Sequence, residues 1–192
     1  MALRHGESFP GYDLFLPHQQ LGTSPSQFEE PLTAILLRTT LSARSIDFAH
    51  PRVCGVVVST QRGPLALFSA YFQPTSGAGL MELSSILTRV RQQFPLILLG
   101  ADCNGHSPWW GPPDTASSPL GRRVEALILH HRLTVVNDPD QGPTFEQGWV
   151  GGGETYIDVT LATTSLFRLV HSWQVQSCLP LDSDHHALTY TI

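Results

Sequence analysis

Two segments of the chain carry apolar residues at helical spacing. Residues 79–94 place them every three or four positions, which predicts an amphipathic helix that Pro95 is expected to end. Residues 120–131 repeat this spacing and predict a second helix of the same kind. The residues expected on the two buried faces are Leu80, Leu83, Ile86, Leu87, Val90, Val124, Leu127 and Ile128.

Short apolar and β-branched runs predict strands between and around these helices. Residues 51–60 and 65–72 flank a Gln-Arg-Gly-Pro turn and are expected to form an antiparallel hairpin. Residues 96–99 (LILL) are wholly apolar and precede Gly100, which indicates a strand buried on both faces. Residues 1–31 are predicted to be irregular. The remaining predicted strands are residues 32–38, 133–137, 144–145, 156–161, 173–175 and 186–192.

The order of these elements indicates the class of fold. Strands alternate with two helices, without an internal repeat or a low-complexity linker, which favours an α/β fold built in layers. A length of 192 residues suits a single domain covering residues 1–192. No apolar run is long enough for a membrane span or for the core of a signal peptide, so an intracellular protein is expected.

Charge and cysteine content narrow the choice of function. The formal net charge is −5. This balance argues against a protein held on nucleic acid mainly by a general positive field, but acidic metal ligands would give a nuclease the same balance. The three cysteines, Cys54, Cys103 and Cys178, are odd in number and form no CxxC motif. They are therefore expected to be free thiols rather than zinc ligands or disulfides.

The densest polar stretch, GADCNGHSPWWG, follows directly on the buried strand LILL. In an extended backbone, Asp102 and Asn104 would point the same way at the end of that strand. Asp offers a hard oxygen for Mg²⁺ or a base for water, and Asn can orient a water or donate to a phosphate oxygen. The alternative is an Asx turn that closes the strand.

Two further motifs carry titratable groups. Asp158 lies inside the apolar run YIDVTL, where a carboxylate is costly to bury unless it is paired; it could also simply cap a turn. The stretch Ser183-Asp184-His185-His186 precedes the last predicted strand. Nearby carboxylates favour the cationic form of a histidine, which could then stabilise a phosphate, although a polar loop is an equally open interpretation.

Taken in order, these motifs resemble those of the endonuclease/exonuclease/phosphatase superfamily, which includes exonuclease III-like apurinic endonucleases and DNase I. The nearer resemblance is to the apurinic-type endonuclease domain of non-LTR (LINE-like) retrotransposons. It implies a layered β-sandwich flanked by helices, of the DNase I-like type. The stretches that carry the resemblance lie within residues 64–192 and read GADCNGHSPWWG, RRVEALILHHRLTVVN, GPTFEQG, TYIDVTLA, SWQVQS and DSDHHAL.

The resemblance implies catalytic roles for the matching side chains. Asp102 would activate the attacking water or protonate the leaving oxygen, and Asn104 would position the phosphate and the water. Asp158 would orient His185, which would bind the phosphate. Tyr71, in SAYFQPTS, would donate to a phosphate oxygen, although a lone tyrosine in a strand is more often a core residue.

The resemblance also implies binding residues, a metal and a substrate. Asp184 is the implied metal-site carboxylate, and His106, Ser107 and Thr155 are the implied substrate contacts, with Thr155 standing where the family often has Ser. The implied reaction is a metal-dependent nick in target DNA, with Mg²⁺ or Mn²⁺ assisting in-line attack by water. The 3′-hydroxyl would prime a reverse transcriptase, a domain expected in the parent polyprotein but absent here, and an active enzyme is expected in the nucleus.

A phosphatase or phospholipase of the same superfamily is a weaker interpretation. The HSPWWG and PTF motifs favour the retrotransposon branch.

The sequence departs from the family pattern at its beginning. The family normally starts with two further strands, of which the second ends in a Gln-Glu pair whose Glu binds the metal. The residues before Gly11 predict neither strand, so the fold is expected to lack its N-terminal strands. Glu7 is the nearest candidate for that ligand; a solvated terminal charge is the alternative. Weak metal affinity is expected, and the alternative function is a catalytically impaired remnant that at most binds nucleic acid.

Overall fold

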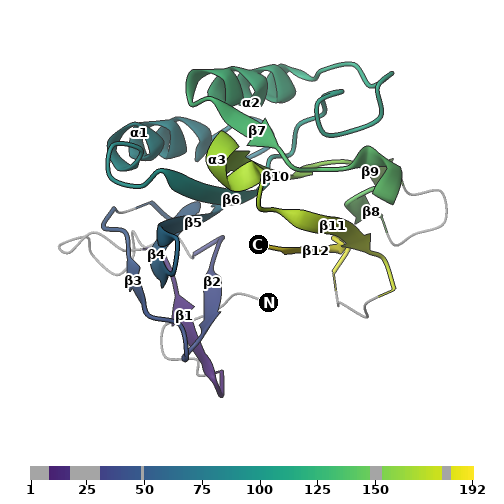
Figure 1. Cartoon of the computed structure of the whole chain (residues 1–192). Helices are drawn as coiled ribbons and strands as arrows, with labels where there is room; N and C mark the ends of the chain where they lie inside the picture. The colour runs from purple at the N-terminus through teal and green to yellow at the C-terminus, as the bar shows by residue number, and fades with distance from the viewer. Residues whose placement is uncertain (1–8, 18–30, 49, 148–152, 179–182) are drawn as a thin grey trace, which may run out of the picture. The chain divides into compact units, whose positions relative to one another are not determined.

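The computed structural model describes residues 9–17, 31–48, 50–147, 153–178 and 183–192 (Figure 1). Contacts group the chain into two compact units, Met1–Leu99 and Gly100–Ile192. The prediction of one domain over residues 1–192 stays a prediction. Glu7, the candidate metal ligand, lies outside the described residues. None of the helices in the described ranges is long and apolar enough to cross a membrane.

The first unit contains two antiparallel groups of strands and one helix. Strands β1 (Tyr12–Phe15) and β2 (Ile35–Arg38) pair with each other. Strands β3 (Ala43–Ser45), β4 (Val53–Thr60) and β5 (Gly63–Tyr71) form an antiparallel ladder, and helix α1 (Leu80–Val90) follows. Strand β6 (Leu96–Asp102) begins in this unit and ends in the second.

The β4–β5 pair confirms the predicted hairpin, because Thr60 and Gly63 face each other across its turn. Strand β1 corrects the prediction that residues 1–31 are irregular. Its four residues form a strand because β2, more than twenty positions further along the chain, supplies the hydrogen-bonding partners. Strand β3 was not predicted either, and it exists through pairing with β4.

Helix α1 buries the five apolar residues that its spacing predicted. Its start is capped by Glu82, whose Oε2 accepts a hydrogen bond from the Gly79 N–H at 3.0 Å. The helix ends at Val90 rather than at Phe94, so Pro95 is not what ends it. The Phe94 N–H closes a turn on the Val90 carbonyl, and this turn leads into β6.

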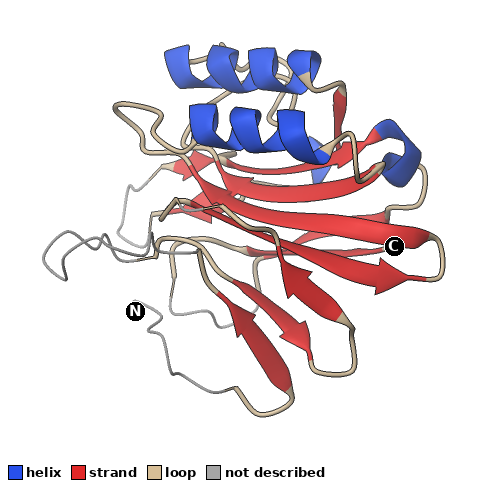
Figure 2. Ribbon diagram, turned by 90° about the vertical axis from the view of Figure 1, so that its left-hand side faces the viewer, coloured by secondary structure: helices blue, strands red, loops and turns tan. Residues whose placement is uncertain are grey.

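The second unit contains the remaining elements. Helix α2 (Pro119–His130) starts with Ser118 as its N-cap and Pro119 at its first position, and it buries all three predicted residues. The other elements are β7 (Leu133–Val135), η2 (Pro139–Gln141), β8 (Phe145–Glu146), β9 (Glu154–Thr155), β10 (Asp158–Thr163), α3 (Thr164–Phe167), β11 (His171–Gln176) and β12 (Ala187–Thr191). In this unit α2 packs against β7, and α3 packs against β10 and β7; helices are blue and strands red in Figure 2.

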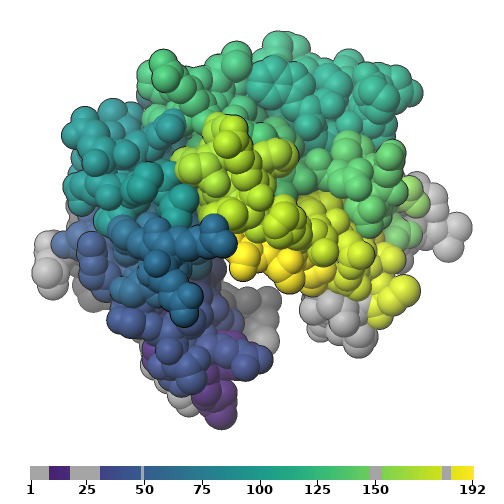
Figure 3. All heavy atoms as spheres, in the orientation of Figure 1, coloured from purple at the N-terminus to yellow at the C-terminus, as the bar shows by residue number. Residues whose placement is uncertain are grey.

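Three antiparallel pairs organise the strands of the second unit: β7 with β10, β8 with β9, and β11 with β12. Two further bonds hold the end of the chain against β8. The His186 N–H donates to the Thr144 carbonyl at 2.8 Å, and the Glu146 N–H donates to the Asp184 carbonyl at 2.9 Å. In Figure 3 the yellow C-terminal residues accordingly share one face with the green residues of the same unit.

Candidate active site

Asp102 ends β6, and the chain turns sharply after it. Asn104 has a φ of 47°, a left-handed conformation that Asn tolerates better than most residues. Its N–H donates to Asp102 Oδ1 at 3.2 Å, and its side chain also hydrogen-bonds that carboxyl. This is the Asx turn named as the alternative, so the prediction of extended backbone from Asp102 to Asn104 was wrong. Asn104 nevertheless holds the Asp102 carboxyl in place.

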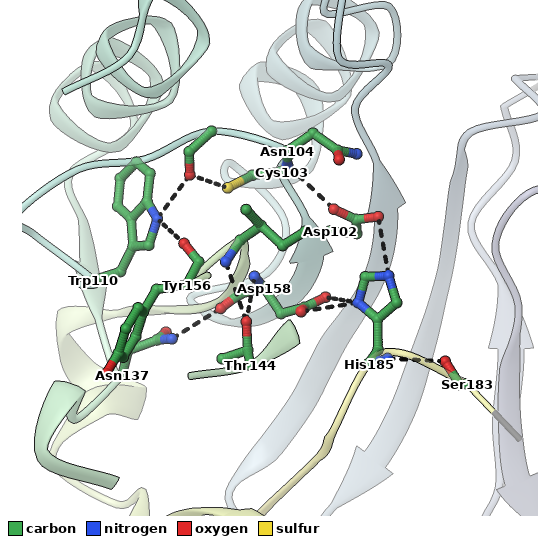
Figure 4. Close-up of polar contacts among 12 residues, drawn as sticks. Asp102, Cys103, Asn104, Trp110, Asn137, Thr144, Tyr156, Asp158, Ser183 and His185 are labelled. Carbon is green, nitrogen blue, oxygen red and sulfur yellow. Dashed lines mark hydrogen bonds and ion pairs between the residues drawn. The ribbon is translucent and has the colours of Figure 1, made fainter. Parts of the chain in front are cut away.

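His185 lies between two carboxylates (Figure 4). Its Nδ1 is 3.0 Å from Asp158 Oδ2 and 3.2 Å from Asp158 Oδ1, so the carboxylate of Asp158 faces the ring with both oxygens. Its Nε2 is 3.9 Å from Asp102 Oδ2. The Phe145 ring contacts the imidazole edge-on, with the ring centres 4.9 Å apart. The second unit therefore brings Asp102, Asn104, Asp158 and His185 together.

The electrostatics of this group follow from its geometry. The hydrogen bond that the His185 ring donates to the Asp158 carboxylate raises the pKa of His185; burial opposes this, and the charges of Asp158, Asp102 and Asp184 add to the rise. Burial raises the pKa of Asp102 to about 6, and the charge of Asp158 adds to that, while His185 and the hydrogen bonds of Asn104 oppose it. The site therefore favours a cationic imidazole beside a carboxyl that titrates near neutral pH.

The side chains of Thr144 and Asn137 hold the backbone of Asp158 in position. Thr144 is fully buried, and its Oγ1 accepts hydrogen bonds from the N–H groups of Ile157 at 3.1 Å and Asp158 at 3.0 Å. Asn137 Nδ2 donates to the Asp158 carbonyl at 2.9 Å, and its Oδ1 accepts from the Thr160 N–H at 2.7 Å. These supports were not predicted. The motifs LTVVN and GPTFEQG contain both residues, but spacing alone assigns them no partner.

The loop after Asn104 is anchored by Trp110, whose side chain is fully buried. Its Nε1 donates to the carbonyls of Gly105 and Tyr156, both at 3.1 Å, which joins the loop to the segment before β10. The neighbouring Trp109 does not share this role, because it is 41% exposed.

The remaining predicted residues fall in three places. Asp184 is exposed, and its charge acts on His185. His106, Ser107 and Thr155 line one cavity of about 220 Å³ in the second unit. Tyr71 is the last residue of β5 and belongs to the first unit, so its role at the phosphate stays a prediction.

The donors around His185 suit a hard cation in kind, but they are few. Mg²⁺ usually binds one or two protein carboxylates and keeps several waters, and Asp102 and Asp184 are of that kind. Within the described ranges, however, no three His, Cys, Asp or Glu residues are grouped so that they could hold a metal ion. Among the described residues, the carboxylates of Asp102 and Asp184 are the ones near His185 that could contribute to holding such an ion.

Comparison with known proteins extends this description. The sequence profile of the family described as endonuclease-reverse transcriptase matches residues 65–189. The endonuclease domain of TRAS1, a telomere-specific non-LTR retrotransposon, is 23% identical with a TM-score of 0.78, covering 96% of this chain and 81% of that one. No curated protein matches the sequence.

Two other solved structures share the fold at lower identity. The AP endonuclease LMAP from Leishmania major is 15% identical with a TM-score of 0.67, covering 94% of this chain and 70% of that one. The 3′ phosphatase NExo from Neisseria, bound to a product DNA hairpin, is 15% identical with a TM-score of 0.65, covering 95% and 80%. These similarities confirm the predicted α/β, DNase I-like fold class.

Proposed function

Because the chain belongs to the endonuclease-reverse transcriptase family, we propose that it is a metal-dependent DNA endonuclease that nicks target DNA for retrotransposon insertion. The observation that carries this proposal is the row Asp102–His185–Asp158, in which one imidazole lies between two carboxylates. DNA as the substrate is supported by NExo, whose structure contains a product DNA hairpin.

In the proposed reaction a water attacks a phosphodiester in line with the leaving 3′-oxygen. His185, kept cationic by Asp158, would bind a non-bridging phosphate oxygen and stabilise the charge that develops there. Asp102 has a pKa of about 6, so it can take a proton from the attacking water or return one to the leaving oxygen near neutral pH. Thr144 and Asn137 would keep Asp158, and through it His185, in one orientation.

A divalent cation would be held by Asp184 with Asp102 nearby, and it would supply a more acidic water and charge neutralisation at the phosphate. Asp102 and Asp184 both carry negative charge toward His185. Without a cation this arrangement concentrates like charges around one imidazole, which favours occupation by Mg²⁺ or Mn²⁺.

The experiment is nicking of supercoiled plasmid in Mg²⁺, followed as conversion to the open circle. The wild-type chain is expected to nick, and Asp102→Ala is expected to lose about a hundredfold or more of the rate, the usual size of an acid–base contribution. His50→Ala is the control, because His50 pairs with Glu82 in the first unit and should leave the rate unchanged. Equal nicking by Asp102→Ala would mean that the activity comes from elsewhere.

A second candidate is a catalytically impaired remnant that at most binds nucleic acid. It is favoured by the absence of a three-residue metal group among the described residues. Calorimetric titration with Mn²⁺ separates the strength of the site from its chemistry, and binding weaker than micromolar is expected from two carboxylates. Wild-type protein that fails to nick in both Mg²⁺ and Mn²⁺ would support the remnant.

A further inference from the structure

A cavity of about 220 Å³ opens in the second unit, and its lining comes from segments that neighbour proposed catalytic residues along the sequence. One wall comes from the loop that contains His106 and Thr115, and the other from Glu154, Thr155 and Tyr156. His106 follows the catalytic Asn104 by two residues, and Thr155 precedes Asp158 by three. In Figure 4, Asp158 lies between Tyr156 and His185. The cavity lining includes none of the four proposed catalytic residues of this unit, so a ligand in the cavity would not occupy the catalytic group.

The loop wall is held rigidly from behind. Glu125, on α2, accepts hydrogen bonds at Oε1 from the hydroxyls of Ser107 and Ser117, both at 2.6 Å. Ser118 completes the anchor, because its Oγ accepts from the His106 N–H at 3.1 Å and from the Gly121 N–H at 3.0 Å. The shape of this wall is thus set before any ligand arrives, which lowers the ordering cost of binding.

The two walls are also joined to each other. Trp110 bonds to the Tyr156 carbonyl from one side. At Gly111, a Cβ would meet the Ser107 carbonyl oxygen at 3.2 Å and the Tyr156 Cβ at 3.4 Å, so the chains approach closely there. A cavity with fixed walls and mixed lining is the usual form of a small-molecule subsite.

The charge around the cavity selects the kind of group that it can accept. Glu154 is the one carboxylate among the described residues that line the cavity, and its charge, after burial and together with that of Asp140, raises the pKa of Tyr156 on the same wall. None of the described residues that line the cavity is Arg, although His106 lines the other wall. Glu154 would repel a phosphate on its wall and would attract a group that donates hydrogen bonds. The Tyr156 ring and Pro112 offer apolar surface of the kind on which a planar ring stacks.

We infer that this cavity receives one nucleobase of the target DNA, and that Glu154 selects a base with an exocyclic amino group. A carboxylate accepts from such an amino group, and threonine hydroxyls such as those of Thr155 and Thr115 bond to any base edge. Thymine has no exocyclic amino group and is disfavoured. The assignment of a DNA base as the occupant rests on the proposed function. It adds to that function a sequence preference next to the nick.

The test is a titration of ¹⁵N-labelled protein with single deoxynucleosides, which carry no phosphate, in buffer without metal. Deoxycytidine, deoxyadenosine and deoxyguanosine are expected to shift amide signals of residues 106–115 and 154–156 with millimolar affinity. Thymidine is expected to bind at least about threefold more weakly, because it lacks the hydrogen bond from an exocyclic amino group to Glu154. Equal binding of all four nucleosides, or no shift in these residues up to about 20 mM, would overturn the inference.

Glu154→Gln should abolish the preference for amino-bearing nucleosides. The neutral amide oxygen is a weaker acceptor than a carboxylate oxygen, and the amide NH₂ group donates where the second carboxylate oxygen accepted. Asp114→Asn is the matched control: it removes a carboxylate from an exposed position in the same loop that does not line the cavity. It should keep the wild-type preference. Both variants are exposed substitutions whose amide spectra report folding directly. A preference that survives Glu154→Gln would overturn the role of Glu154.

This experiment separates the two proposals. Protein that nicks plasmid but binds no nucleoside in the cavity contradicts the inference and leaves the endonuclease standing. Protein that binds amino-bearing nucleosides but nicks nothing contradicts the endonuclease and leaves the base-binding cavity standing. If both hold, nicks mapped on plasmid should share an amino-bearing base at one fixed position, and Glu154→Gln should relax that position alone.

Discussion

The two compact units differ in what they bury. Among the described residues, the polar residues that are buried as a whole all lie in Gly100–Ile192, whereas Met1–Leu99 buries single polar atoms, such as Thr33 Oγ1 and Arg52 Nε, in a largely apolar interior. Burying a polar group costs free energy unless it finds a hydrogen-bonding partner. In the second unit, buried polar groups such as those of Ser107 and Thr144 find such partners, and these hydrogen bonds hold the loop and Asp158 in place. Its buried polar residues are Ser107, His131, Thr144, Thr160 and Thr163.

Each unit also pairs a histidine with a carboxylate, and the His50–Glu82 pair of the first unit is not equivalent to the His185–Asp158 pair of the second. His50 Nε2 is 3.6 Å from Glu82 Oε1, and Glu82 is also the capping residue of α1. The distance from His185 Nδ1 to Asp158 Oδ2 is shorter, at 3.0 Å, and the ring faces both carboxylate oxygens of Asp158. Asp102 lies on the other side of the same ring. The comparison indicates that a pair becomes chemically useful through the further groups that surround it.

The largest expected effect is the loss of activity in His185→Ala. Removing the cation beside the phosphate should lower the nicking rate by about a hundredfold to a thousandfold, as for a lost oxyanion donor. His50→Ala should stay within about threefold of wild type, because neither His50 nor its partner Glu82 belongs to the proposed catalytic group. Plasmid nicking under identical conditions measures both. A similar loss of nicking rate in the two variants would contradict the assignment of catalysis to His185 rather than to His50.

The next effect is on stability in the first unit. Leu83, on α1, is fully buried. Leu83→Ala should destabilise the fold by about 2–5 kcal/mol, the range for deleting a buried leucine. Urea unfolding measures this, and nicking per folded molecule should stay unchanged. A fall in the activity of the folded protein would connect this core to the catalytic group.

Thr144→Val is the counterpart in the second unit. Valine nearly keeps the volume but leaves the N–H groups of Ile157 and Asp158 without their acceptor, at a cost of about 1–3 kcal/mol. Because Asp158 holds His185, nicking should fall as well. The imidazole proton signals of His185 should shift in NMR spectra, a change that loss of stability alone does not produce. Unchanged signals together with normal nicking would contradict the supporting role of Thr144.

The smallest expected effect is a dependence of stability on pH. The pKa of Asp102 rises from 3.8 to about 6 in the folded state, so between these values the folded chain binds more protons than the unfolded one. The contribution of Asp102 to the free energy of unfolding therefore falls as pH rises from about 4 to 6. Asp102→Asn removes this fall and should gain up to about 3 kcal/mol at pH 7.5, the free energy that corresponds to this rise in pKa, in which the attraction to His185 is already included.

Urea unfolding with EDTA present, at pH 4 and pH 7.5, measures this difference. The two proteins should be similarly stable at the lower pH and diverge at the higher one. Asp13→Asn, on the exposed β1 strand, is the control and should follow the wild-type curve. A constant gap between Asp102→Asn and wild type at both pH values would contradict the role assigned to burial and to Asp158.

Local patterns predicted the elements whose stability comes from near neighbours. The buried face of α1 and the β4–β5 hairpin follow directly from residue spacing and one turn. Strand β1 could not be predicted, because its hydrogen bonds come from β2, a distant part of the chain. The turn at Asn104 was predicted only as an alternative, since an Asx turn and a strand end share the same residues.

The order of the motifs along the chain was enough to indicate the family and the fold class. Folding, in contrast, brings Asp158 and His185, which are 27 residues apart, within 3.0 Å of each other. Folding also places Thr144 and Asn137 where they hydrogen-bond to the backbone of Asp158. The reason is that spacing along a chain does not set distance in space. The pKa of Asp102 depends on burial and on charges from other segments, and these exist only after the chain has folded.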